Sequence, residues 1–230
     1  MLFPFDPTLI LILPGLLLAF YAQIKVKSTF ARYLRVPAAK GISGAGVASE
    51  LLRREGLNRV GVEMVAGELT DHYDPRSQVV RLSPAVYQGT SLAALGVAAH
   101  ETGHALQHAN GYFPLAIRNS LVPVVNFGTA MAMPLFFIGL LFSFPALLKL
   151  GLWFFLFAVL FQVVTLPVEL DASRRAVALL QSHGFVTSAE IGGAKKVLRA
   201  AALTYVAALV VSLLQFLRLL VIAGAFGERD

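Results

Sequence analysis

The segment with the clearest chemical signal is residues 98–108, which read A-A-H-E-T-G-H-A-L-Q-H. His100 and His104 lie four positions apart, and Glu101 directly follows the first histidine. In an α-helix this spacing places both imidazoles on one face, one turn apart, where they can bind the same metal ion. Glu101 would lie about 100° around the helix, where a general base for an activated water molecule belongs. The pattern predicts a zinc site with two histidine ligands and Glu101 as the catalytic base.

The residues around this motif favour a helix. Thr90 and Ser91 offer side-chain oxygens that can cap its first turn, and no proline interrupts the apolar run that follows. The alternative is that H-E-x-x-H occurs here by chance, in which case the histidines are ordinary surface or core residues.

A zinc site needs a third protein ligand. His108 lies two turns from His100, about 12 Å along a straight helix, too far for one ion with bonds of about 2 Å. The glycine that bends the chain in H-E-x-x-H-x-x-G-x-x-H enzymes is also missing. The third ligand is therefore expected to be a distant carboxylate.

Composition points to a membrane protein. Of the 230 residues, 57% are hydrophobic and only 14% are charged, with a mean hydropathy of +0.72. The absence of cysteine excludes disulfides and cysteine-ligated zinc. The net charge of +6 is not gathered into one stripe, so we expect no nucleic-acid partner.

Four apolar stretches are long enough to cross a bilayer: 8–24, 121–148, 150–168 and 200–226. They divide the chain into an N-terminal membrane anchor (1–24), a metallopeptidase region (25–120), a transmembrane hairpin (121–168), a polar helix that supplies the third ligand (169–199) and a last span with a charged tail (200–230). The anchor is expected to be uncleaved, with residues 3–5 at the interface, because its basic residues follow the apolar run. The hairpin is expected to turn near Lys149.

The distribution of positive charge predicts the orientation. Residues 25–118 hold eleven Lys and Arg and residues 169–199 hold five, whereas the opposite side would hold only Lys149 and Arg229. By the positive-inside rule both polar segments are cytoplasmic and both termini lie outside. We therefore expect a multi-pass protein of the bacterial inner (cytoplasmic) membrane with a cytoplasmic active site. Arg218, inside the last apolar stretch, is expected to snorkel to the interface.

The region before the motif predicts a small α+β unit. Residues 47–54 form a helix, and residues 59–65 and 78–82 read as strands joined through the turn-rich stretch 71–75. We expect a short antiparallel sheet whose edge strand can pair with an extended peptide. The expected fold is a mainly α membrane protein, with about four transmembrane helices and a small zincin-like catalytic region.

Topology narrows the choice of the third ligand. Glu169 and Asp171 emerge from the third apolar stretch at the level of the zinc helix, where acids are costly unless they are paired or bind metal. Glu169 is the candidate ligand. Asp171 would point to the opposite side, where it can contact a histidine N–H or an arginine. The alternative is that Glu169 caps a helix or pairs with Arg174.

Three motifs resemble those of the bacterial neutral zinc metallopeptidases of the YugP-like membrane family: 100–108 (H-E-T-G-H-A-L-Q-H), 72–87 (H-Y-D-P-R-S-Q-V-V-R-L-S-P-A-V-Y) and 166–176 (L-P-V-E-L-D-A-S-R-R-A). More distantly the chain resembles membrane gluzincins, in which the first Glu of an E-x-x-x-D motif completes the site. The resemblance implies His100, His104 and Glu169 as zinc ligands and Glu101 as catalytic. This chain departs at Ser173, where that motif has Asp.

These patterns together predict an integral membrane zinc metalloendopeptidase. The transition state would need one more donor for its oxyanion, with candidates His72, Tyr73, Arg76, Tyr112 and Arg118. Candidates to contact the zinc ligands without binding the ion are Asp171, Ser173, His108 and His72.

The expected substrates are extended segments of membrane proteins, in processing or quality control, with the lipid bilayer as the surroundings and with membrane-protein partners or an oligomer left open. The alternative is a zinc-binding membrane scaffold without catalysis, although a scaffold has no use for Glu101. A zinc transporter is disfavoured because the four apolar stretches contain no His, Asp or Glu.

Overall fold

The computed structural model describes residues 6–227, so the expectations for residues 3–5 and for the tail 228–230 lie outside the described part of the chain. The elements in chain order are α1 (Leu9–Leu34), α2 (Gly44–Arg54), β1 (Gly61–Met64), β2 (His72–Asp74), β3 (Val79–Leu82), α3 (Pro84–Tyr87), α4 (Leu92–Ala109), α5 (Phe113–Leu141), α6 (Pro145–Ser182) and α7 (Ile191–Gly227).

The protein is a mainly α membrane protein, as the sequence predicts. Among the described residues, α1, α5, α6 and α7 are the helices long and apolar enough to cross a bilayer. The hairpin turn differs from the expectation, because α5 ends at Leu141 and Lys149 lies inside α6. Ser143 adopts a left-handed φ of 50°, and Pro145 suits the first position of a helix because its missing N–H is not needed there.

The chain forms two compact units. The described parts of the first unit are residues 6–22, 117–166 and 204–227, and the second unit comprises residues 23–116 and 167–203. Helices α1, α6 and α7 each contribute one end to each unit. The H-E-x-x-H helix and Glu169 both belong to the second unit.

The described part of the first unit consists mainly of apolar helix segments, and it contains a partly buried ion pair. Arg218 on α7 pairs with Asp6 at 2.5 Å and donates from Nε to the Thr8 hydroxyl at 3.0 Å. Its side chain is only 13% exposed. The partners of Arg218 therefore lie at and just before the start of α1, and snorkelling of Arg218 to the interface stays a prediction.

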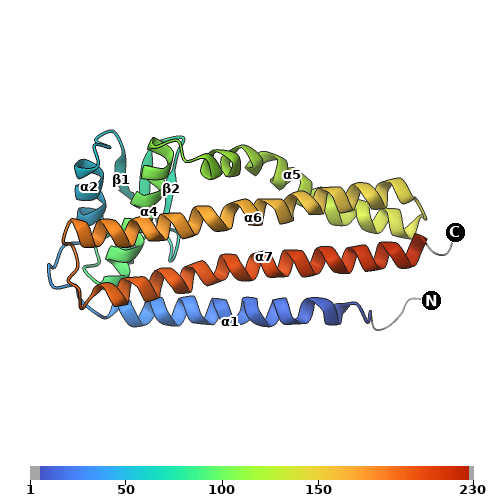
Figure 1. Ribbon diagram of the computed structural model, residues 1–230, viewed down its shortest axis with the longest axis horizontal. Coiled ribbons are helices and arrows are strands. Elements are labelled where there is room, and N and C mark those ends of the chain that lie inside the picture. The colour runs from blue at the N-terminus through green and yellow to red at the C-terminus, as the bar shows by residue number, and fades with distance from the viewer. Residues whose placement is uncertain (1–5, 228–230) are drawn as a thin grey trace. The chain divides into compact units, whose positions relative to one another are not determined.

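The second unit contains a three-stranded sheet in the order β1-β3-β2, of which Figure 1 labels β1 and β2. Strands β2 and β3 form an antiparallel hairpin, with Tyr73 opposite Val80, but β1 pairs parallel to β3. The sequence prediction of an antiparallel pair was wrong because residues 72–74 form a strand instead of a turn. The chain reverses direction twice between β1 and β3, so these two strands run the same way.

Helix α4 begins at an N-cap and approaches α6 closely. Ser91 accepts a hydrogen bond from the backbone N–H of Ala94 at 3.2 Å, as the sequence indicates. A Cβ placed on Gly103 would lie 2.8 Å from the carbonyl oxygen of Ala172 on α6. Glycine at this position therefore lets the two backbones approach more closely than any other residue would.

We expect Gly103→Ala to destabilise the protein although alanine is the better helix former. The added methyl group meets a backbone carbonyl that cannot rotate away, and overpacking of this kind costs about 1–3 kcal/mol. Gly96→Ala is the matched control on the same helix, because its Cβ would meet Ala194 at an ordinary 3.6 Å and gain about 1 kcal/mol of helix propensity. Thermal unfolding in detergent should show a lower Tm for Gly103→Ala only; equal Tm values would contradict the close approach.

Candidate metal centre

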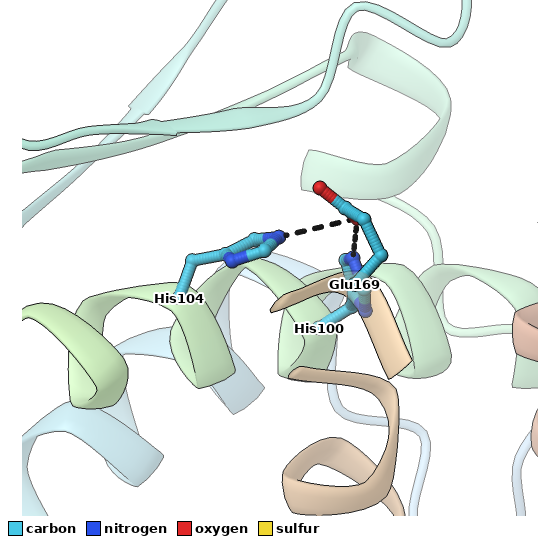
Figure 2. A group of neighbouring side chains, drawn as sticks. All are labelled: His100, His104 and Glu169. Carbon is cyan, nitrogen blue, oxygen red and sulfur yellow. Dashed lines mark hydrogen bonds and ion pairs between the residues drawn. The ribbon is translucent and has the colours of Figure 1, made fainter. Parts of the chain in front are cut away.

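Three side chains predicted as ligands come together in the second unit (Figure 2). His100 and His104 project from α4 toward Glu169 on α6, and one potential ligand atom from each lies within 4.8 Å of the others. Glu169 Oε2 lies 3.3 Å from His100 Nε2 and 3.5 Å from His104 Nε2. Ligand atoms around a tetrahedral zinc with bonds near 2.0–2.1 Å are about 3.3 Å apart. The donor set and its spacing therefore fit a zinc ion.

The outer nitrogen of each histidine ring contacts an oxygen of this chain. His104 Nδ1 lies 3.0 Å from Gln107 Oε1, and His100 Nδ1 lies 3.2 Å from Ser173 Oγ. The Gln107 amide nitrogen donates to Val168 O at 2.8 Å and to Asp171 Oδ2 at 2.9 Å. Because both amide hydrogens are used, Oε1 must be the atom that faces His104.

The contact with Gln107 fixes the position of one histidine proton. The Gln107 oxygen can only accept, so His104 carries a proton on Nδ1, and Nε2 is the ring nitrogen that remains to bind a metal ion. Ser173 can accept from His100 Nδ1 in the same way. Neutral imidazoles whose outer N–H is held by an oxygen are the usual state of histidine metal ligands. The hydrogen bonding therefore passes the test for a metal site independently of the ligand distances.

Asp171 anchors this network without joining the ligand group. Its carboxylate pairs with Arg174 and with Arg175 Nε at 2.6 Å, and it accepts from Gln107. Asp171 contacts the arginines, as expected, and reaches His104 only through Gln107. Arg174, the alternative partner considered for Glu169, pairs with Asp171 instead.

Glu101 lies beside the ligands in a buried position. Only 7% of the residue is exposed. Burial raises the pKa of its carboxyl group, and this effect outweighs the opposing influence of His100 and His104. Asp71, whose carboxylate accepts from the Ser83 backbone N–H at 2.7 Å, is another nearby negative charge. A carboxyl group with these surroundings binds protons more readily than a surface glutamate.

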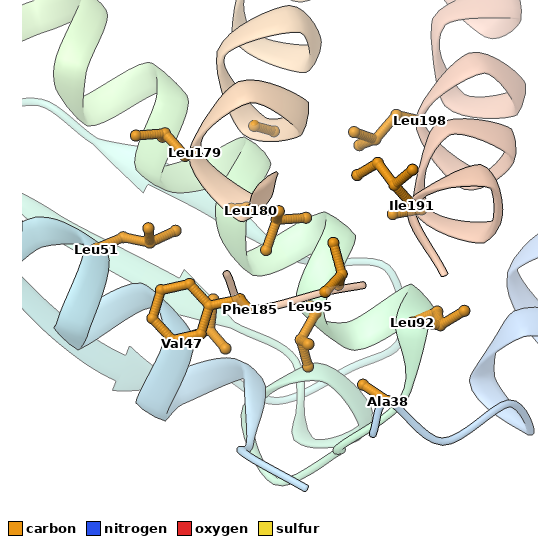
Figure 3. Packing of buried hydrophobic residues seen from close by; sticks show 14 of the residues in the cluster. Ala38, Val47, Leu51, Leu92, Leu95, Leu179, Leu180, Phe185, Ile191 and Leu198 are labelled. Atoms are coloured by element: carbon orange, nitrogen blue, oxygen red, sulfur yellow. The ribbon is translucent and has the colours of Figure 1, made fainter. Parts of the chain in front are cut away.

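A hydrophobic cluster holds the helices that carry the site. It joins residues from α2, α4, α6 and α7 (Figure 3), including Leu51, Leu95, Leu180 and Leu198. Phe185, from the loop between α6 and α7, packs into the same cluster with 2% of its surface exposed. The face of α4 opposite the ligands is therefore fixed, so the histidines cannot rotate away from Glu169.

The remaining sequence candidates have other contacts. Tyr73 on β2 lies with its hydroxyl 2.9 Å from His108 Nδ1, so His108 is not in the ligand group. His72 contacts the Thr70 carbonyl at 2.8 Å, and the Tyr112 ring lies 5.7 Å from the guanidinium of Arg175. Arg76 is exposed, and Arg118 belongs to the first unit. An oxyanion donor among these residues stays a prediction.

Gln107 is the residue that the sequence interpretation missed. It lies within the quoted motif, three positions after His104, on the same helix face. It is also fully buried, with 0% exposed. A long amide one turn from a candidate ligand, on the same helix, was the available signal.

Comparisons with known proteins identify a family and a relative that this chain matches. Residues 8–224 match the family model described as "Putative neutral zinc metallopeptidase". The chain is 51% identical to the "Putative membrane protease YugP" of Bacillus subtilis (strain 168) over 205 residues, which cover 89% of this chain and 91% of that protein. No solved structure matches the chain.

We predict that Glu169→Ala loses zinc while Glu101→Gln keeps it, because only Glu169 lies within the ligand group. Metal content of the detergent-purified proteins, measured by mass spectrometry, should be about one zinc per chain in wild type and Glu101→Gln. Asp171→Asn is the control and should also keep its zinc, because asparagine retains a side-chain oxygen that can accept from the Gln107 amide. A full equivalent of zinc in Glu169→Ala would assign the third ligand to another residue.

We also predict that Gln107→Met weakens zinc binding about 10- to 100-fold, the usual effect of removing a side chain that orients a ligand. Methionine fills the space, but its thioether sulfur is only a weak hydrogen-bond acceptor for the N–H at His104 Nδ1. The zinc dissociation constant, measured by competition with a chelator, should be unchanged in Thr102→Val. Thr102 is equally buried, but its hydroxyl donates only to the Ala98 carbonyl. Equal weakening in both variants would point to a general loss of packing.

Proposed function

Since this chain belongs to the neutral zinc metallopeptidase family, we propose that it is a membrane zinc endopeptidase of the gluzincin type, with His100, His104 and Glu169 as ligands. One observation carries the proposal. The two Nε2 atoms face Glu169, while both Nδ1 atoms are held by oxygens of the chain. Histidines in an ordinary core have no need of this arrangement.

The chemistry follows from the residues beside the ligands. A zinc ion held there would act as a Lewis acid and make a water molecule acidic enough to react at neutral pH. Glu101 takes the proton as the water attacks the peptide carbonyl, and then delivers it to the leaving amine. The buried position of Glu101 keeps bulk water from competing for this proton. Gln107 and Ser173 keep the histidine rings in place during both steps.

The sheet supports an extended peptide as substrate. Strand β2 is an edge strand among the described residues, and Tyr73 on β2 contacts His108 on α4, one turn beyond His104. A peptide that adds to this edge would run alongside the zinc helix and expose its backbone carbonyls. A folded domain cannot present a free strand in this way.

The membrane helices suggest where substrates come from. Four helices within residues 6–227 are long and apolar enough to cross a bilayer. The excess of Lys and Arg in residues 25–118 and 169–199 favours a cytoplasmic site, with both termini outside, in a bacterial inner membrane. Substrates would then be unfolded or extended segments of membrane proteins, cleaved during processing or quality control.

We predict that the purified enzyme in liposomes cleaves an unfolded polypeptide tethered to a transmembrane helix, and spares a folded domain on the same helix. Glu101→Gln should lower the cleavage rate about 100- to 10,000-fold with unchanged zinc content. The rate is measured from the appearance of fragments on gels.

Two outcomes would contradict this proposal. Wild-type protein with a full equivalent of zinc that cleaves neither substrate would favour the non-catalytic scaffold. Equal cleavage of the folded and unfolded domains would exclude selection of an extended strand.

A further inference from the structure

A second candidate site lies between α6 and α7 in the second unit. It is a pocket of about 310 Å³ that does not include the metal ligands. Three of its lining residues are cations, Arg174 from α6 and Lys195 and Arg199 from α7. Leu170, Val177 and Leu198 give it an apolar wall. The pocket is therefore amphipathic.

The charges of the pocket are not balanced by the chain. None of the described residues that line it is acidic. Within residues 6–227 no carboxylate pairs with Lys195 or Arg199, and only Arg174 has such a partner, Asp171. Lys195 and Arg199 are one helical turn apart, so their ammonium and guanidinium groups repel each other. An anion in the pocket would relieve this repulsion.

The apolar wall is arranged in line with the membrane helices. Residues 183–190 connect α6 to α7, so the two helices are antiparallel there and Leu170 lies level with Ala202. Beyond this level both helices are free of Lys and Arg as far as Lys149 on α6 and Arg218 on α7. The cations therefore mark the point where two membrane-crossing helices change from apolar to basic.

We propose that this pocket binds an anionic phospholipid. Its phosphate would lie against Arg174, Lys195 and Arg199, with the acyl chains along Leu170 and the apolar stretches that continue from it. Basic pockets between membrane helices bind such headgroups because the phosphate meets two or three cations while the chains stay in hydrocarbon. A free phosphate would satisfy the cations but leave the apolar wall in water.

The pocket also adjoins the metal centre. Ser173 lines the pocket and contacts His100 Nδ1 at 3.2 Å. Arg174 lines it as well and pairs with Asp171, which accepts from Gln107, the partner of His104. A bound lipid would thus lie one side chain from His100. Lipid binding in this pocket does not depend on peptidase activity.

The test uses full-length protein, freed of lipid in detergent and titrated with phosphatidylglycerol or phosphatidylcholine under native mass spectrometry. We expect one tightly bound phosphatidylglycerol and no comparable phosphatidylcholine. Lys195→Gln/Arg199→Gln should weaken phosphatidylglycerol binding about 10- to 30-fold, as expected for two cations near a lipid phosphate. Thermal unfolding of each variant checks that it is folded.

The matched control is Lys196→Gln/Arg35→Gln, which removes the same charge from two exposed positions outside the pocket. An equal loss of affinity in this control would overturn the proposal in favour of general charge attraction. The absence of any preference for phosphatidylglycerol would also overturn it. Competition by inorganic phosphate at the affinity of the lipid would show a free-anion site instead.

Discussion

The close contact between α4 and α6 is the constraint on which the metal centre depends. The two histidines are one turn apart on one helix, so they can share an ion only with a ligand from another helix that comes very near. Gly103 provides this proximity, because its missing side chain leaves room for the backbone of α6 at Ala172. Ala172 lies three positions after Glu169, so the contact point and the ligand are on neighbouring turns. The hydrophobic cluster on the other face of α4 keeps the contact closed.

This contact carries an electrostatic cost that the structure offsets locally. Glu101, Glu169 and Asp171 are all buried, and buried carboxylates are unfavourable unless they are paired or bind metal. Asp171 has its two arginines and Gln107. Glu169 faces both histidines. In the neutral form that binds metal, these imidazoles offset less of the negative charge of Glu169 than a cation would. A divalent ion bound by His100, His104 and Glu169, as proposed above, would offset further negative charge in this cluster.

Local patterns predicted much of the site, and long-range pairing accounts for what they missed. The four-residue spacing of His100 and His104, the Ser91 cap and the apolar spans are properties of a single helix, so the sequence shows them directly. Glu169 required an argument from topology, since it is 65 positions from His104. The parallel pairing of β1 with β3 and the ion pair of Arg218 with Asp6 depend on where the chain returns in space. Periodicity carries no information on either of them.

Ser173 shows how a departure from a motif can be compensated nearby. In the E-x-x-x-D motif of the resemblance described above, position 173 would be Asp, whereas this chain has a serine. The Ser173 hydroxyl lies 3.2 Å from His100 Nδ1 and adds no charge. A carboxylate is present two positions earlier, but Asp171 points to the other side of α6 and acts through Gln107 on His104. Both amide hydrogens of Gln107 are donated to oxygens, one of them on Asp171. Gln107 can therefore pass on to His104 only the orienting effect of the Asp171 carboxylate and part of its polarisation. The carboxylate of Asp171 therefore acts on His104 through Gln107, while His100 has only the uncharged Ser173 hydroxyl at its outer nitrogen.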